Sequence, residues 1–189
     1  PIKSSAASDV YKRQMLAAPS SGSGKTMITC GILQILKNRG YRVSSFKCGP
    51  DYIDPMFHKT VIGTAAYNLE TYLMSNDAVN YLLNKNSGDI AVIEGVMGFY
   101  DGFSFTEKGS THELSEITDT DVILVVNCRG MSLSAMALVK GFKEFRKNNI
   151  KGVIFNNLSE KLYGNLSEEC RKIGLVPLGF LPNIKDVQI

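Results

Sequence analysis

Cysteine and histidine are scarce in this chain of 189 residues, which has four cysteines, two histidines and no tryptophan. The spacing of the cysteines argues against a zinc site or a disulfide framework, because no two form a CxxC pair: Cys30, Cys48, Cys128 and Cys170. We therefore expect reduced thiols in a cytosolic protein. Neither His58 nor His112 has metal-ligand spacing, and we expect both on the surface or in turns.

Long apolar runs and a strong charge of either sign are also missing. No run approaches the roughly 18 residues of a membrane-spanning helix, and the N-terminus lacks the apolar core of a secretory signal. The net charge is only +3, and residues 1–14 contribute a surplus of two. We therefore expect neither a membrane nor a nucleic acid as partner. Residues 1–14 have no apolar periodicity, and we expect a disordered tail or an artefact there.

Apolar strands and amphipathic helices alternate along the rest of the chain, from Met15 to Ile189. Several strand segments are apolar throughout, which is typical of parallel strands covered on both faces. The pattern predicts one α/β domain, a parallel sheet with helices on both faces, as in P-loop NTPases. Residues 49–75 are expected to be mostly loop with short helical pieces, because glycine, proline and aspartate interrupt them. The expected strands are residues 15–19, 41–49, 89–98, 121–130, 151–158 and 175–182, and the expected helices are 25–40, 76–86, 110–118, 132–149 and 165–174.

The segment PSSGSGKT (residues 19–26) lies between the first strand and the first helix, which is the context of a phosphate-binding loop. Lys25 is expected to contact the β- and γ-phosphates of ATP, and Thr26 to ligate Mg²⁺. Pro19 stands where the usual motif has glycine. Small residues before the lysine let backbone N–H groups surround phosphate oxygens, and we expect them to bind the nucleotide: Ser21, Gly22, Ser23 and Gly24.

Acidic residues follow two of the expected strands, at the edge where parallel sheets bind ligands. Glu94 ends an apolar strand where P-loop enzymes place a carboxylate linked to Mg²⁺. Asp51 and Asp54 follow the second strand, where they can serve Mg²⁺ or a substrate, or form turns beside two prolines. Lys47 ends that strand and can hold an anion. The spacing of Asp101, in the loop after Glu94, is more typical of a turn residue.

Polar residues also follow two later strands. Asn156 has one donor and one acceptor with which to read the edge of an adenine, although a turn or helix cap would explain it equally. Arg129 can bind a carboxylate or phosphate, or be solvated. The residues alone leave both alternatives open.

Four stretches resemble the N-terminal ATPase domain of the cobyrinate a,c-diamide synthases: LAAPSSGSGKT, SSFKCGPDYIDPMFH, DIAVIEGVMGFYDG and VILVVNCRGMSLSAMALVKGF. The resemblance extends from Met15 to about Pro182. It implies an enzyme that uses ATP to phosphorylate a side-chain carboxylate of a tetrapyrrole, after which ammonia displaces the phosphate to give an amide. It also implies that a second, C-terminal domain releases the ammonia from glutamine.

The same resemblance implies roles for individual residues. It places Mg²⁺ on Thr26 and Glu94, with help from Asp51 or Asp54, and it places Asp101 near the substrate or the ammonia. The residues that it implies in catalysis are Lys47, Asp51, Tyr52, Asp54 and Asp101.

Nothing in the chain resembles the glutamine-hydrolysing half, so we expect a fragment of a longer enzyme. Its expected partners are a tetrapyrrole and the missing domain, and a homodimer stays open. Related enzymes that amidate nickel-sirohydrochlorin or hydrogenobyrinate are alternatives. A partition-type ATPase switch is another, although it would carry a second lysine at the position of Ser20. The segment GPDYIDP argues against a dethiobiotin synthetase.

Overall fold

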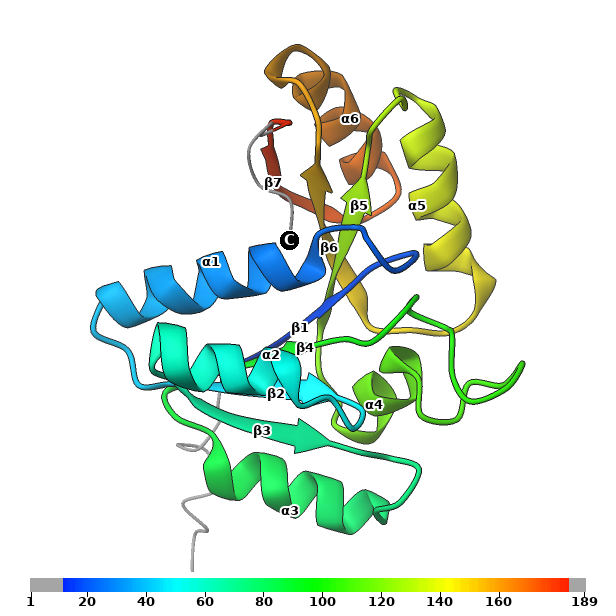
Figure 1. The fold of residues 1–189 in the computed structure, drawn as a ribbon. Helices are drawn as coiled ribbons and strands as arrows, with labels where there is room; N and C mark the ends of the chain where they lie inside the picture. The colour runs from blue at the N-terminus through cyan, green and yellow to red at the C-terminus, as the bar shows by residue number, and fades with distance from the viewer. Residues whose placement is uncertain (1–11, 184–189) are drawn as a thin grey trace, which may run out of the picture.

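The computed structural model describes residues 12–183, which form a seven-stranded parallel sheet in the order β3-β2-β4-β1-β5-β6-β7 (Figure 1). The expected α/β class is confirmed. The strands are β1 (Lys12–Ala17), β2 (Val43–Cys48), β3 (Ala65–Leu69), β4 (Ile90–Glu94), β5 (Val122–Asn127), β6 (Ile150–Asn156) and β7 (Val176–Leu181). The helices are α1 (Lys25–Asn38), α2 (Ile53–Phe57), the π-helix η1 (His58–Ile62), α3 (Asn76–Asn86), α4 (Thr111–Ile117), α5 (Ser134–Phe145) and α6 (Glu160–Lys172).

Helices cover both faces of the sheet and bury a separate core on each (Figure 1). Leu124 and Val126 of β5 face the core that also contains buried residues of α3, α4, α5 and α6. Val125, between them, faces the opposite core, which contains buried residues of α1 and η1. Successive strand residues point to opposite faces, so apolar residues at consecutive positions are needed to fill both cores.

Several expected boundaries differ from the observed ones by a few residues, and three segments were assigned the wrong structure. Strand β1 begins at Lys12, so three residues assigned to a tail belong to the sheet; the rest of that segment lies outside the described residues. Residues 65–69, expected to be loop, form β3 at the edge of the sheet, where only Leu69 is fully buried. Helix α6 begins at Glu160, five residues early, behind Ser159. A short or partly exposed segment carries little apolar pattern, which explains why these parts were missed.

The topology brings four strand ends to one edge of the sheet. Strand β1 lies between β4 and β5, and the phosphate loop that follows it stands beside the end of β4. Lys47 of β2 and Glu94 of β4 are register partners, so their side chains emerge side by side. Asn156 ends β6 on the other side of the loop. This edge is where parallel α/β sheets bind their ligands.

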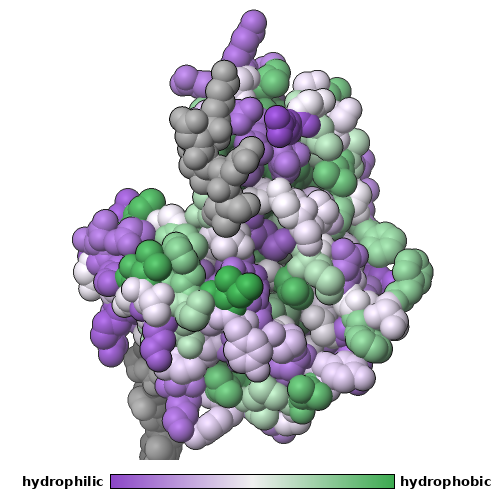
Figure 2. Space-filling view, viewed as in Figure 1, coloured by the Kyte–Doolittle hydropathy of each residue, from purple (hydrophilic) through white to green (hydrophobic). Residues whose placement is uncertain are grey.

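No helix in residues 12–183 is long and apolar enough to cross a membrane. The face drawn in Figure 1 carries hydrophobic side chains over α1 and α2, mixed with hydrophilic ones (Figure 2). Exposed apolar side chains of these two helices include Ile35, Ile53 and Met56.

Gly24 makes the turn from the phosphate loop into α1. Its φ of 93° lies in the left-handed region, and a Cβ at this position would stand 2.3 Å from Nδ2 of Asn156. Only glycine combines this backbone conformation with so close an approach. The close approach of Gly24 to Asn156 joins the start of α1 to the end of β6.

We predict that Gly24→Ala destabilises the protein and weakens nucleotide binding, because the new methyl group must displace Asn156 and strain the turn. The matched control is Gly31→Ala in the same helix, where a Cβ would meet nothing within 4 Å. The unfolding temperature of that variant should equal the wild-type value or lie slightly above it, because its free energy of unfolding rises by at most roughly 0.5–1 kcal/mol. Thermal unfolding compares the two, and equal stability would contradict the role given to Gly24.

Candidate active site

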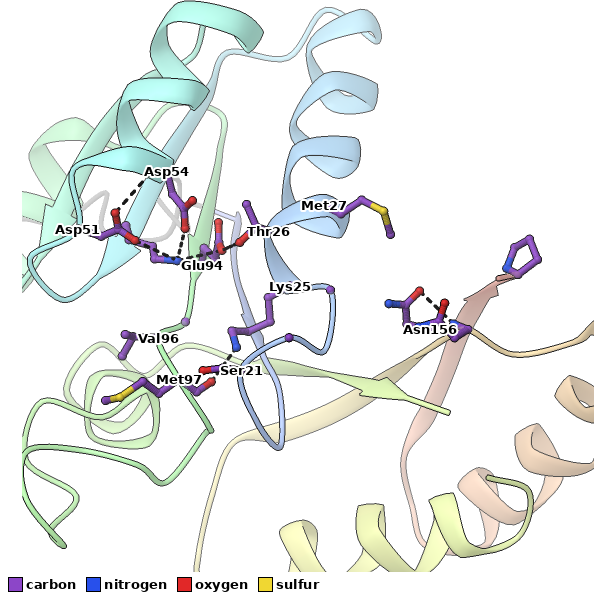
Figure 3. A pocket seen from close by; sticks show the side chains of 16 residues that line it. Ser21, Lys25, Thr26, Met27, Asp51, Asp54, Glu94, Val96, Met97 and Asn156 are labelled. Carbon is purple, nitrogen blue, oxygen red and sulfur yellow. Dashed lines mark hydrogen bonds and ion pairs between the residues drawn. The ribbon is translucent and has the colours of Figure 1, made fainter. Parts of the chain in front are cut away.

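A cavity of about 720 Å³ opens at the carboxyl edge of the sheet, between the phosphate loop, the α2 loop and the segment after β4 (Figure 3). Three residues predicted for the site do not line it, namely Ser23, Tyr52 and Asp101. Arg129 does not line it either. The predicted residues that line the cavity are Ser21, Gly22, Gly24, Lys25, Thr26, Lys47, Asp51, Asp54, Glu94 and Asn156.

Hydrogen bonds within the phosphate loop, and one from Asn156 of β6, fix the conformation of the loop. Ser23 is buried, and its hydroxyl donates to the carbonyl of Ser20 at 2.9 Å. Nδ2 of Asn156 donates to the carbonyl of Ser23 at 2.9 Å, and its Oδ1 accepts from the N–H of Asn157 at 3.0 Å. Asn156 therefore supports the loop in this structure, and its contact with an adenine remains a prediction.

Lys25 extends across the cavity to the segment after β4. Its ammonium donates to the carbonyl of Met97 at 2.7 Å (Figure 3). Burial, followed by the charge of Lys47, lowers the pKa of Lys25, while Glu94 and Asp101 oppose the shift. A lysine held by one neutral carbonyl keeps its charge available for a phosphate. A backbone carbonyl gives no signal in a sequence, so this partner was not predicted.

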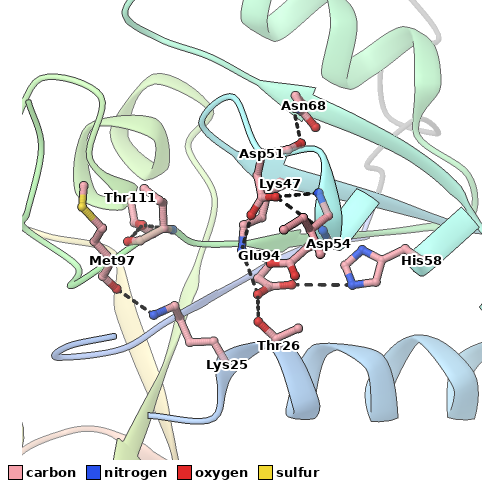
Figure 4. Close-up of polar contacts among 12 residues, drawn as sticks. Lys25, Thr26, Lys47, Asp51, Asp54, His58, Asn68, Glu94, Met97 and Thr111 are labelled. Carbon is pink, nitrogen blue, oxygen red and sulfur yellow. Dashed lines mark hydrogen bonds and ion pairs between the residues drawn. The ribbon is translucent and has the colours of Figure 1, made fainter. Parts of the chain in front are cut away.

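Glu94 is completely buried where β4 ends, and its Oε1 accepts two hydrogen bonds. The hydroxyl of Thr26 donates to Oε1 at 2.6 Å, and Nζ of Lys47 donates to the same atom at 2.9 Å (Figure 4). Burial raises the pKa of Glu94, and Lys47 and Thr26 offset only part of that effect. Thr26 and Glu94 are therefore in direct contact, and their expected joint binding of Mg²⁺ remains a prediction.

Lys47 lies at the centre of an acidic cluster. Its Nζ is 2.9 Å from Glu94 Oε1, 2.5 Å from Asp54 Oδ2 and 3.6 Å from Asp51 Oδ2 (Figure 4). Burial lowers the pKa of Lys47, but the carboxylates of Glu94 and Asp54 more than offset it, so the net shift is upward. Burial also opposes ionisation of Asp54, and the hydrogen bond and charge of Lys47 reverse this and lower its pKa.

Asp51 and Tyr52 lie at the start of α2. Oδ1 of Asp51 accepts from the N–H of Ile53 at 2.9 Å, so the expected turn geometry is present. Its Oδ2 nevertheless faces Lys47, and the residue lines the cavity. Tyr52 is 83% exposed and does not line the cavity. A catalytic role for Tyr52 remains a prediction.

Asp101 supports the segment after β4. Its Oδ2 accepts from the N–H of Gly98 at 3.1 Å, in the turn that presents the Met97 carbonyl to Lys25. Gly98 is needed there because a Cβ would stand 2.7 Å from the carbonyl oxygen of Pro19. Asp101 thus acts here as a turn residue, and its expected place near the substrate or ammonia remains a prediction.

The expectation for the two histidines was wrong, because both are buried. His58 begins η1; its Nδ1 is hydrogen-bonded to the hydroxyl of Ser45 at 2.7 Å, and its Nε2 is 3.6 Å from Oε2 of Glu94 (Figure 4). His112 of α4 contacts the carbonyl of Lys147 at 3.0 Å, away from the cavity. Short helical pieces were expected in residues 49–75, but their positions were not, so the burial of His58 beside Glu94 had no signal.

The residues at Glu94 fit a bound Mg²⁺ ion. Oε1 of this buried carboxylate meets the hydroxyl of Thr26 at the lining of the cavity, whereas Oε2 faces the buried ring of His58. Three carboxylates, from Asp51, Asp54 and Glu94, surround the single ammonium of Lys47. Within residues 12–183 no group of three His, Cys, Asp or Glu is arranged to hold a metal ion. Mg²⁺ commonly takes only one or two protein oxygens, with phosphates and water completing its shell.

The model of the CobQ/CobB/MinD/ParA nucleotide binding domain matches residues 14–188. The chain belongs to this family.

Curated relatives support the resemblance found in the sequence. A cobyrinate a,c-diamide synthase from Sulfolobus acidocaldarius is 39% identical over 181 residues, which is 95% of this chain and 41% of that protein. One from Priestia megaterium is 45% identical over 154 residues, 79% of this chain and 34% of that protein. The chain thus spans about two-fifths of the length of these relatives.

Solved structures confirm the fold alone. Cell division protein FtsY from Thermotoga maritima superposes with a TM-score of 0.66 at 16% identity, over 92% of this chain and 62% of that one. Hydrogenase maturation factor HypB from Archaeoglobus fulgidus gives 0.58 at 14% identity, over 89% and 80%.

We predict that Lys47→Met lowers the free energy of unfolding by about 3 kcal/mol at neutral pH, because it leaves buried carboxylates without their cation. Asp54 has a lowered pKa in the folded protein, so its stabilising effect is present above its ordinary value of 3.8 and is lost as the pH falls through the lower one. The deficit of the variant should therefore shrink in acid. Urea unfolding at several pH values measures it.

The control for this prediction is Lys140→Met, which removes a lysine whose partner Glu144 is equally exposed. Its unfolding should follow the wild type at every pH, because exposed ion pairs add little stability. A Lys47→Met deficit that stayed constant or grew in acid would contradict the charge arrangement proposed for the cluster.

Proposed function

We propose that this chain is the ATP-using domain of a cobyrinate a,c-diamide synthase, which activates tetrapyrrole side-chain carboxylates for amidation in cobalamin biosynthesis. The proposal extends to a second, glutamine-hydrolysing domain that supplies ammonia, and to a cytosolic location. The names of the curated relatives support the reaction, and the matched family supports the nucleotide.

The observation that carries the proposal is the meeting of two different loops across one cavity. The phosphate loop brings Lys25 and Thr26, and the loop after β2 brings Asp51 and Asp54 with Lys47 beneath them. A site for nucleotide hydrolysis alone needs only the first set. The second set lies where an acceptor carboxylate would stand next to the γ-phosphate, and Lys47, together with Mg²⁺ when bound, would offset the negative charge of Asp51 and Asp54 there.

The proposed reaction has two steps. In the first, a carboxylate oxygen of the tetrapyrrole attacks the γ-phosphorus, the bond to the β-γ bridging oxygen breaks, and ADP leaves. In the second, ammonia attacks the acyl carbon, the C–O bond to phosphate breaks, and the amide, phosphate and a proton are released. The first step brings two anions together, so its barrier falls when fixed positive charge lies between them.

The chain's own residues supply most of that charge. Lys25 leaves the Met97 carbonyl for the β- and γ-phosphates, and the N–H groups from Ser21 to Thr26 surround the phosphate oxygens. Lys47 remains anchored by Glu94 and lies on the acceptor side. Mg²⁺, when bound, would add positive charge beside the phosphates. Thr26 and Glu94 would hold it, with Asp51 as a further candidate.

Amide formation with free ammonia tests the proposal. The chain is incubated with ATP, Mg²⁺, ammonium chloride and cobyrinate, and the tetrapyrrole is analysed by mass spectrometry. We expect products lighter by the difference between a carboxylic acid and an amide, and ADP formed in step with them. Nickel-sirohydrochlorin and hydrogenobyrinate, tested in parallel, identify the preferred macrocycle. ATP hydrolysis without amide from any of them would contradict the proposal.

We also predict that Lys25→Ala weakens ATP binding about 10- to 100-fold, because it removes a charged hydrogen bond to the phosphates. Isothermal titration calorimetry measures the affinity. Lys140→Ala, an exposed lysine of α5, is the control and should bind ATP like the wild type. If Lys25→Ala bound ATP with wild-type affinity, the assignment of the phosphate loop to the nucleotide site would be contradicted.

A further inference from the structure

His58 is a buried polar side chain next to the site that neither the proposed reaction nor its cofactors account for. Its side chain is fully buried, and Thr64 fixes its backbone carbonyl through two hydrogen bonds of 3.1 Å, one from the N–H and one from the hydroxyl. The residue begins a π-helical turn, a conformation often found at functional sites. The turn places the ring beside the carboxylate of Glu94 (Figure 4).

The two ring nitrogens of His58 have different surroundings. Nδ1 is hydrogen-bonded to the hydroxyl of Ser45 at 2.7 Å, and Ser45 lies on β2, two residues before Lys47. Nε2 has no hydrogen-bond partner within residues 12–183, and the same holds for the atom that it faces, Oε2 of Glu94. Two buried polar atoms, 3.6 Å apart, thus lie opposite one another with no other partner described.

This arrangement selects one tautomer of the ring. If the Ser45 hydroxyl donates to Nδ1, the ring proton is on Nε2 and points at the carboxylate of Glu94. The opposite tautomer would place the lone pair of Nε2 against that carboxylate. A shift of about 0.6 Å would bring the pair to hydrogen-bond distance.

We propose that His58 is a positioning residue for Glu94: with Nδ1 held by Ser45, its Nε2–H restrains Oε2 and keeps Oε1 directed at Thr26 and the cavity. Three elements then hold the carboxylate, through Thr26 of α1, Lys47 of β2 and His58 of η1. Partners of this kind orient the groups that bind metals. The inference rests on the proposed function, since it concerns the carboxylate expected to hold Mg²⁺.

The tautomer is tested first, by NMR of protein labelled with nitrogen isotope in histidine. The chain has only two histidines, so His112→Gln leaves the ring of His58 alone in the spectrum. We expect the proton on Nε2 at neutral pH, and a shift of that nitrogen's signal in Glu94→Gln. A proton on Nδ1, or no response to Glu94→Gln, would overturn the inference. Neither readout needs ATP or the tetrapyrrole.

The second test compares binding of a fluorescent ATP analogue with Mg²⁺ and with a chelator. His58→Phe should weaken the Mg²⁺-dependent affinity about 10- to 100-fold and leave the metal-free affinity unchanged. His58→Gln, whose amide N–H reaches toward the position of Nε2, should restore most of the loss. Ser45→Ala should give a smaller loss in the same direction, because it frees the tautomer.

The outcomes separate the two proposals. Wild-type Mg²⁺ dependence in a folded His58→Phe, or equal losses in His58→Phe and His58→Gln, would overturn the positioning role. If the wild-type chain binds no nucleotide, the proposed function fails, and the NMR result alone decides the arrangement at His58. Thermal unfolding checks that each variant is folded; if His58→Phe is not, the NMR experiment and His58→Gln decide.

Discussion

The ammonium of Lys47 is the charge on which the acidic side of the cavity depends. It contacts carboxylates from β4, from the loop after β2 and from the first turn of α2, at distances of 2.5 to 3.6 Å. Without it, Glu94 would be a buried carboxylate with no cation beside it other than the more distant Lys25, and such a group is costly to ionise. Register pairing of Lys47 with Glu94 makes this arrangement a direct consequence of the sheet.

The other side of the cavity depends on backbone contacts. The N–H groups of Gly95 and Phe99 donate to the carbonyls of Leu16 and Ala18, each at 2.8 Å, so the segment after β4 is attached to the start of the phosphate loop. The Met97 carbonyl then reaches Lys25. The nucleotide side and the acidic side are therefore connected through one short segment.

Much of this was predictable from the sequence, because the strongest signals lie where strands end. The apolar strands β4 and β5 and the glycine-rich loop predicted the sheet, and the acidic residues after β2 and β4 predicted the cavity wall. Strand β3 was missed because it is short and half exposed. The Met97 carbonyl and the burial of His58 depend on backbone turns, which side-chain patterns do not encode. The roles predicted for Tyr52 and Asp101 concern contacts with a bound substrate, which neither side-chain patterns nor the fold of the chain define.

Positional isotope exchange in ATP tests acyl-phosphate formation most directly. ATP labelled with heavy oxygen in the β-γ bridge is incubated with the chain, Mg²⁺ and cobyrinate, without ammonia. Reversible transfer of the γ-phosphate to the carboxylate lets the β-phosphate of ADP rotate, so the label should move to a non-bridging position only when the tetrapyrrole is present. Retention of the label with cobyrinate, or equal movement without it, would contradict carboxylate activation at this site.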